Sequence, residues 1–271
     1  MSTPLWNQRS YWRRIAQLLV VLLCALALKQ YYSTASPNEL RWILAPTTTL
    51  VELVSGKTFE FESYSGYLSS DRTFLIAGSC AGVNFLITAF LLLSLRKLWR
   101  SGGQNISWRF FPLSALIAYL ATLVANTVRI STALLLQQMP LEIGGISPNQ
   151  LHRFEGIFIY FGFLLLLFMV SEIQSSNRFS DAIALEAGAR KSYSDLFRQY
   201  LFPLLIYYTT TLAVPVANSA YRHRLDFGLG PDFWQHSLFV LLTPLLLILL
   251  LAAFRFIAPR AIISSVPRST N

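Results

Sequence analysis

Cys80 is the residue of this sequence whose chemistry most needs an explanation, because it lies between two glycines at the start of an apolar run. The stretch reads Gly-Ser-Cys-Ala-Gly-Val-Asn over residues 78–84, and the apolar run continues to Leu98. A cysteine here is either a small side chain that fills space or a nucleophile on a membrane-embedded scaffold. A nucleophilic thiol must ionise, and apolar surroundings oppose ionisation, so a nearby cation or a helix N-terminus would have to stabilise the charge.

Arg129 and His152 could supply the other groups that cysteine chemistry needs. A guanidinium stays charged, and it can stabilise a thiolate or the oxyanion of a tetrahedral intermediate. An imidazole can take the thiol proton and return it to a leaving amine. Asn126 is three residues from Arg129, on the same helix face, and could orient either partner. Each has a structural alternative: Arg129 can reach lipid phosphates, and His152 beside Arg153 can be an ordinary interfacial residue.

Other residues are weaker candidates for this chemistry. His223 and His236 lie in a polar loop before the last apolar block, and either could be the base. Ser79 could be the nucleophile, although the sequence has no Gly-x-Ser-x-Gly motif around it. Cys24 lies inside an apolar block and is interpreted as a small buried hydrophobe. Two cysteines form neither a metal quartet nor a Cys-x-x-Cys pair, and we expect no metal and no cofactor.

The elements that must position these residues are membrane helices. Hydrophobic residues make up 54% of the 271 residues and charged residues 13%, about half the charged share of a soluble domain. The net charge of +9 does not indicate nucleic-acid binding, because the basic residues flank apolar blocks and form no aromatic-interleaved patch. We predict an all-α polytopic membrane protein with about six spans of roughly 20 residues each. The apolar blocks are residues 15–28, 74–95, 110–136, 156–170, 200–216 and 238–257.

The basic residues also predict the orientation of the chain. They lie before the first block, between the second and third, between the fourth and fifth, and after the sixth, so the positive-inside rule places both termini in the cytoplasm. The first block resembles a signal peptide but has no small-x-small cleavage site before Tyr31, and we interpret it as retained. The basic residues that predict this orientation are Arg9, Arg13, Arg14, Arg96, Lys97, Arg100, Arg109, Arg178, Arg190, Lys191, Arg198, Arg255, Arg260 and Arg268.

Two short segments after the first block are predicted to lie at or outside the membrane. Residues 40–54 are too short and too polar to span, so they predict a helix that lies on or dips into the outer leaflet. Residues 57–71 alternate apolar and polar side chains around Gly66, a pattern that predicts a small extracytoplasmic hairpin.

The start of the second span determines the surroundings of Cys80. Residues 73–76 favour an extended backbone, and we predict that Ser79 is the N-cap and Cys80 the first helical residue. The alternative is a continuous helix from residue 73, which would place Cys80 two turns inside. The fourth span is predicted to begin at Ser147-Pro148 with a capping-box pattern, which puts His152 in the second turn.

Helix geometry places the three candidate residues at one depth. At 1.5 Å per residue, Cys80 lies roughly 27 Å from the inner end of the second span. Arg129 lies roughly 28 Å from the inner end of a third span over residues 110–138, and His152 roughly 30 Å from the inner end of the fourth. Because the hydrocarbon layer is about 30 Å thick, all three are expected at the outer interface. This agreement favours a chemical role over three separate structural ones.

Cys80, Asn126, Arg129 and His152, with the residues next to them, together resemble motifs of the exosortase and archaeosortase family, and the likeness covers roughly residues 12–175. The segment over residues 40–49 and the sequence Cys-Ala-Gly-Val-Asn-Phe over residues 80–85 further resemble the exosortase K branch. One departure is Ala81, where many relatives have serine, and this puts part of an oxyanion site in question. The motifs that carry the resemblance are Cys80-Ala81-Gly82 after an apolar strand, then Asn126-Thr127-Val128-Arg129-Ile130, then His152 with Gly156.

The resemblance implies a single integral-membrane domain, with a catalytic core over about residues 12–175 and an additional helix pair over about residues 198–258. It implies a cysteine protease and transpeptidase that cleaves C-terminal sorting signals of exported proteins, made of a Pro-Glu-Pro-type motif, a transmembrane helix and a basic tail. It places the protein in a bacterial cytoplasmic membrane with an extracytoplasmic active site. The expected partners are these exported proteins and the bilayer, and not nucleic acid.

Residue roles also follow from the resemblance. It makes Cys80 the nucleophile, Arg129 the electrostatic stabiliser and His152 the base. Asn126, Ser79 and Gly82 are the expected supporting residues. The alternative function is a non-enzymatic transporter or polysaccharide-export partner in which Arg129 binds an anion. That alternative predicts polar residues near the membrane midplane and internal repeats, and the sequence offers little of either.

Overall fold

The computed structural model describes residues 5–101, 106–138, 148–175, 193–213 and 237–252. Within these ranges four helices are long and apolar enough to cross a membrane, as the sequence predicts for the first four spans. The fifth and sixth predicted spans lie partly outside the described residues. The helices are α1 (Leu5–Thr34), α3 (Val83–Arg100), α4 (Phe110–Gln138), α5 (Pro148–Ser175), α7 (Tyr193–Tyr208), a π-helical turn η2 (Thr209–Ala213) and a short apolar helix over Ser237–Ala252.

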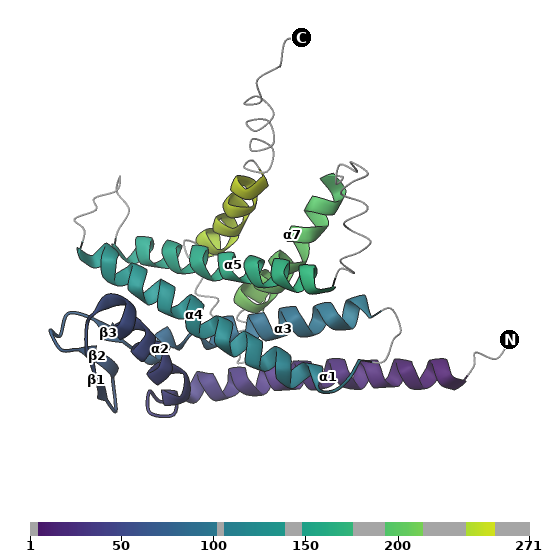
Figure 1. The fold of residues 1–271 in the computed structure, drawn as a ribbon, viewed down its shortest axis with the longest axis horizontal. Coiled ribbons are helices and arrows are strands. Elements are labelled where there is room, and N and C mark those ends of the chain that lie inside the picture. The colour runs from purple at the N-terminus through teal and green to yellow at the C-terminus, as the bar shows by residue number, and fades with distance from the viewer. Residues whose placement is uncertain (1–4, 102–105, 139–147, 176–192, 214–236, 253–271) are drawn as a thin grey trace, which may run out of the picture.

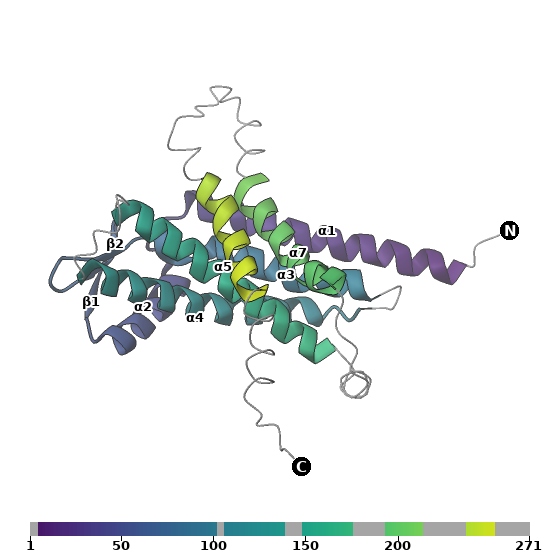
Figure 2. The ribbon, with the colours of Figure 1, turned by 90° about the horizontal axis from the view of Figure 1, so that it is seen from above.

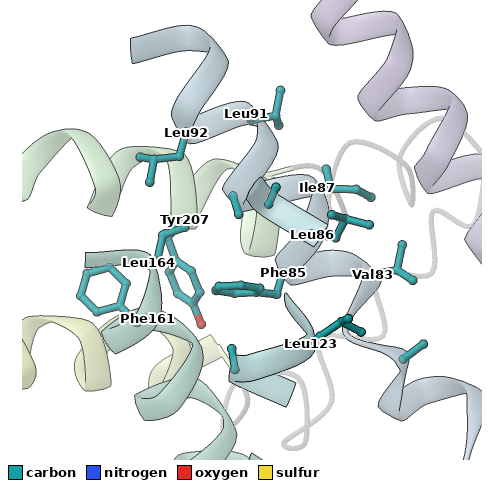
Figure 3. Close-up of a cluster of buried hydrophobic side chains, with 14 of the residues drawn as sticks. Val83, Phe85, Leu86, Ile87, Leu91, Leu92, Leu123, Phe161, Leu164 and Tyr207 are labelled. Atoms are coloured by element: carbon teal, nitrogen blue, oxygen red, sulfur yellow. The ribbon is translucent and has the colours of Figure 1, made fainter. Parts of the chain in front are cut away.

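The central helix of the bundle is α3, which contacts α1, α4, α5 and α7. The long helices α1, α3, α4 and α5 all run along the long axis of the molecule (Figure 1). Helix α7 and the helix over Ser237–Ala252 cross α5 in the view from above (Figure 2). Phe161 of α5 packs edge-on against Tyr207 of α7, with ring centroids 5.3 Å apart. Side chains from α3, α5 and α7 thus converge in one apolar core (Figure 3).

Helix α1 lies at the edge of the bundle, and this corrects the prediction for Cys24. Over residues 10–34 of α1, the buried side chains are Gln17, Val21 and Ala25, spaced four apart, so a single narrow stripe faces the bundle there. Cys24 falls outside this stripe and is exposed, not buried as predicted. Its apolar surroundings in the sequence come from leucines such as Leu23 that also point away from the bundle.

A small sheet and helix α2 (Arg41–Ser55) gather at the end of the bundle opposite the N-terminus (Figure 1). Helix α2 confirms the short helix predicted over residues 40–54, and it packs its buried face against α4. The sheet contains the predicted hairpin, β1 (Phe59–Glu62) and β2 (Gly66–Ser69), and a third antiparallel strand, β3 (Leu75–Ile76), next to β2. Strand β3 leads directly to Cys80.

The turn between β2 and β3 is organised by the carboxylate of Asp71. It accepts hydrogen bonds from Lys57 Nζ at 2.8 Å, Ser69 Oγ at 2.6 Å and Thr73 Oγ1 at 2.8 Å. These donors, Lys57 first, hold the pKa of Asp71 well below its usual range. The turn therefore depends on the ionised form of this side chain.

At the opposite end of the bundle, charged side chains connect α3 to α5. Arg96 Nε donates to Glu172 Oε1 at 2.9 Å, and Arg100 donates to Glu172 Oε2 at 2.9 Å. Nearby, Gln17 of α1 donates to the carbonyl oxygen of Ile106 at 2.9 Å. The basic residues that flank the second span are therefore gathered at one end of the molecule, and Cys80 lies toward the other.

Candidate active site

Cys80 lies in a short 3-10 turn, η1 (Gly78–Ala81), between β3 and α3. The preceding Ala77 is extended, and the Cys80 N–H donates to the Ala77 carbonyl oxygen at 2.8 Å. The predicted absence of a continuous helix from residue 73 is confirmed. The prediction that Ser79 is the N-cap and Cys80 the first residue of the membrane helix is wrong, because Gly82 is the N-cap of α3 and the helix begins at residue 83.

Gly82 separates the turn from the helix because its backbone is left-handed, with φ +71°. It also lies against the two helices that complete the site. A Cβ at this position would stand 3.1 Å from Thr122 Cγ2, 3.3 Å from Asn126 Cγ and 3.3 Å from Tyr160 Oη. The geometry therefore requires glycine for two reasons, the backbone conformation and the close approach of α4 and α5.

Asn126 connects the Cys80 turn to α5. Its side chain is fully buried, its Nδ2 donates to the carbonyl oxygen of Cys80 at 2.5 Å, and its Oδ1 accepts from Tyr160 Oη at 2.8 Å. The donor and the acceptor of this amide are thus both hydrogen-bonded, and Asn126 on α4 connects η1 to α5. The supporting role expected for Asn126 has a specific geometry: it holds the backbone of the cysteine and not the thiol.

Arg129 lies one helical turn along α4 from Asn126 and contacts the same tyrosine. Its guanidinium donates to Tyr160 Oη at 3.4 Å and stands 5.4 Å from the centre of the ring. It interacts electrostatically with Cys80 and with Glu155. A Cβ at Gly156 would come within 2.9 Å of Arg129 Nε, so α5 approaches the side chain through a glycine. The structure thus brings the Cys80 turn, Asn126 and Arg129 together through Tyr160.

His152 is placed by its backbone alone. Helix α5 begins at Pro148, as predicted, and His152 falls in its second turn. Position 152 is one turn before Gly156, on the same helix face as the glycine that meets Arg129. The side chain of His152 lies outside the described part of the structure, as do the predicted cap Ser147 and the alternative bases His223 and His236.

Three contributors to the site were missed from the sequence. Tyr160 joins Asn126 to Arg129, Tyr32 Oη donates to the Gly78 carbonyl oxygen at 3.5 Å, and Lys29 Nζ donates to Asn84 Oδ1 at 2.7 Å. The sequence could have indicated Tyr160, because positions 152, 156 and 160 are spaced four residues apart and so lie on one face of a span. A tyrosine hydroxyl inside such a span needs a hydrogen-bond partner.

A cavity of about 600 Å³ opens beside the Cys80 turn and continues into the bundle. Ser79 and Gly82, on either side of Cys80, line it, and Ser79 is exposed there. Arg129 and Tyr160 line it from α4 and α5. Within the described ranges, no cluster of three or more His, Cys, Asp or Glu side chains could hold a metal ion.

The arrangement combines a half-buried thiol on a turn held by hydrogen bonds, a nearby cation, and a cavity lined by that cation and by two neighbours of Cys80 in the chain, Ser79 and Gly82. Such a constellation can stabilise negative charge on sulfur or on an oxygen bonded to a carbon under attack. A scan against protein-family models, a search of curated proteins and a search of solved structures each gave no match.

Proposed function

We propose that this protein is a membrane-embedded cysteine peptidase or transpeptidase of the exosortase type, which cleaves C-terminal sorting signals of exported proteins. The observation that carries the proposal is the shared network of Cys80, Asn126 and Arg129 through Tyr160. Its hydrogen bonds join residues 31 to 46 positions apart, on three elements, next to Cys80. A cysteine that only fills space would not need the cation of Arg129 near it.

In the proposed reaction, the Cys80 thiol loses its proton to His152 and attacks the carbonyl carbon of the scissile peptide bond. Arg129 stabilises the oxyanion that forms. The intermediate collapses when His152 returns the proton to the leaving amine, which departs with the C-terminal tail. The thioester on Cys80 then reacts with water, or with an amine of an acceptor, and the thiol is regenerated.

The location of the site belongs to the same proposal. The basic ends of α1 and α3 would face the cytoplasm of a bacterial cell, as the positive-inside rule favours. Cys80 would then lie at the extracytoplasmic interface, where an exported protein arrives. The sheet and α2, at the same end of the bundle, would flank the approach of the substrate (Figure 1).

The direct test is processing of a co-expressed protein with a C-terminal sorting tail of the Pro-Glu-Pro type. We expect the unmodified enzyme to shorten this substrate and the Cys80→Ser and Arg129→Ala variants to leave it intact. The matched control is Cys24→Ser, which removes the exposed cysteine of α1 and should retain full processing. Processing by Cys80→Ser equal to that of the unmodified protein would show that the proposed mechanism is wrong.

A thiol probe separates the enzyme from a non-enzymatic anion-binding transporter. In a Cys24→Ser background, a water-soluble maleimide reports on Cys80 alone, since the chain has two cysteines. The enzyme predicts rapid alkylation that slows at least about tenfold in Arg129→Ala, a change that corresponds to about 1.4 kcal/mol in the activation free energy. An unreactive Cys80, insensitive to Arg129, would favour the transporter.

A further inference from the structure

The cavity beside the Cys80 turn is limited to one end of the bundle, the end at which Cys80 lies. Along α1 its lining runs from Tyr32 to Leu22, and along α3 it runs from Val83 to Leu91. These stretches correspond to about 15 Å and about 12 Å of helix. This depth is at most about half of the hydrocarbon thickness, so the cavity stays within the leaflet on the Cys80 side.

The two ends of the cavity differ in chemistry. The mouth carries three cationic side chains, Lys29, Arg129 and Arg153, and no carboxylate belongs to the lining within the described residues. Lys29 Nζ is held at the mouth by its hydrogen bond to Asn84. The charge of this mouth is complementary to an anion.

The inner part of the cavity is apolar, although four threonines line it. Thr88 and Thr210 hydrogen-bond to each other at 2.9 Å, and Thr211 Oγ1 donates to the Tyr207 carbonyl oxygen at 2.6 Å. Thr209 likewise donates to a backbone carbonyl of α7. Their hydroxyls are therefore bonded within the protein. The remaining inner wall is mostly apolar and includes Leu22, Ala25, Leu26, Ile87, Leu91 and Val240.

The cavity also opens toward the bilayer. Leu26 lines it and yet is 59% exposed, and Leu22 is 39% exposed. Both lie on α1, which is the least buried of the four long helices. A ligand can therefore enter sideways, between α1 and its neighbours, without leaving the membrane.

We propose that this cavity binds one anionic phospholipid from the leaflet on the Cys80 side, with the phosphate at Lys29 and Arg153 and an acyl chain in the apolar part. A free phosphate would use the mouth and leave the apolar part unexplained. A spanning peptide helix, about 10 Å wide and 30 Å long, occupies on the order of 2,000 Å³ and would extend far beyond the cavity. A lipid matches the charge, the depth and the lateral entrance together.

Arg129 belongs both to this cavity and to the proposed catalytic site, but the test below measures lipid binding and not processing, so its outcome does not depend on the proposed peptidase function. The full chain is purified in an uncharged detergent, and binding of phosphatidylglycerol and phosphatidylcholine is measured by native mass spectrometry. We expect one retained phosphatidylglycerol per chain and binding of phosphatidylcholine at least about tenfold weaker, which corresponds to the loss of about 1.4 kcal/mol of charge interaction. Cys80→Ser should bind the lipid as the unmodified chain does. Equal binding of the two lipids would overturn the proposal.

Variants locate the headgroup and the chain separately. Lys29→Gln should weaken phosphatidylglycerol binding about tenfold, because one charge-assisted bond to phosphate is lost. Ala25→Phe should weaken phosphatidylglycerol binding by blocking the acyl chain, since residue 25 lines the cavity. Leu23→Phe, on the exposed side of α1, should leave this binding unchanged. Equal phosphatidylglycerol binding by the two phenylalanine variants would contradict an acyl chain in the cavity.

Two further arms identify the occupant. Glycerol phosphate in excess should not displace the lipid, and displacement by it would show a site for the headgroup alone. A synthetic apolar peptide of spanning length should not displace the lipid either, and displacement by it would show a peptide site. A phosphatidylglycerol with a photoreactive group at the chain end should label residues 87–91 and 209–211. Labelling confined to the outer face of α1 would overturn the assignment.

Discussion

At the scale of single residues, Tyr160 is the side chain on which the contacts of the candidate site converge. Its hydroxyl donates to Asn126 and accepts from Arg129, and its ring stacks on Phe85 with centroids 5.1 Å apart. The ring is thus fixed by packing, and the hydroxyl aligns the amide with the cation. Tyr160 does not contact the thiol through any of these bonds, so its role is to position Asn126, which holds the Cys80 carbonyl oxygen, and Arg129.

Tyr160→Phe tests this role, because it removes the hydroxyl and keeps the stacked ring. We expect processing of the sorting-tail substrate, and alkylation of Cys80, to fall about tenfold, since a loss of about 1.4 kcal/mol in alignment has that effect on a rate. Tyr119→Phe is the matched control, because it removes a hydroxyl that donates to the Trp42 carbonyl oxygen at 2.8 Å, away from the site. Equal losses in both variants would mean a general effect on stability.

Gly82 offers a second test at this scale, with Gly56 as its control. Both have left-handed backbones, with φ +71° and +70°, so alanine should cost each about 1 kcal/mol of stability. Only the Gly82 Cβ would meet other side chains, and nothing lies within 4 Å of a Cβ at Gly56. Thermal unfolding should show a loss in both variants, and processing should fall only in Gly82→Ala. Full processing by Gly82→Ala would rule out a need for this close approach.

At the scale of elements, α5 presents a glycine where it meets the cation of α4. A Cβ at Gly156 would stand 2.9 Å from Arg129 Nε, whereas one at Gly162 would stand 3.8 Å from Leu247 Cδ2. The two glycines share one helix, so alanine raises the helix propensity of both by about 1 kcal/mol. This pair separates the position of Arg129 from the stability of α5.

Gly156→Ala is expected to displace the Arg129 side chain and to reduce processing about tenfold or more, by the same conversion of energy to rate. Gly162→Ala should keep full processing and unfold at an equal or higher temperature. Both quantities can be measured on the purified variants. Normal processing by Gly156→Ala would mean that Arg129 does not need its observed position against α5.

The sheet predicts a pH dependence through Asp71. Because its pKa is depressed in the folded state, the carboxylate contributes stability that is fully present above its unfolded-state pKa of about 3.9 and declines as the pH falls below it. Asp71→Asn should therefore lower the unfolding temperature at pH 6, and this difference should shrink as the pH is lowered toward 3. A difference that is constant with pH would show that ionisation of Asp71 does not stabilise the turn.

At the scale of the whole molecule, the bundle is joined by polar contacts at both ends of the long helices. Arg96, whose side chain is only 9% exposed, and Arg100 share Glu172 at one end. Asn126 joins three elements at the other end. The apolar core lies between them (Figure 3). The two ends can therefore be perturbed independently.

Glu172→Gln should destabilise the protein by about 1 to 3 kcal/mol, because it leaves the buried guanidinium of Arg96 without its charged acceptor. Processing per folded molecule should not change, since Glu172 is 16 residues, or roughly 24 Å, along α5 from Gly156, which meets Arg129. Thermal unfolding in detergent measures the first quantity, and Glu60→Gln on an exposed strand position is the control. Equal stability of the two variants would refute the role of this charge cluster.

The sequence by itself determined the helices that local signals define. Apolar length gave the bounds of α4 (Phe110–Gln138), and a proline in the first turn marked the start of α5, because both depend only on neighbouring residues. The shared face of Asn126 and Arg129 followed from helical spacing. The third strand and the extended backbone before Cys80 were likewise indicated by β-prone residues.

Only the tertiary structure decided the rest, because it depends on contacts between distant segments. The left-handed Gly82 follows from the approach of Thr122 and Tyr160, which no local pattern reveals, and it moves the start of α3 beyond the predicted Ser79 and Cys80. The exposure of Cys24 depends on which stripe of α1 meets the bundle. The cavity of about 600 Å³ beside the Cys80 turn exists because six helices and η2 leave space between them, and the packing of whole helices sets that space.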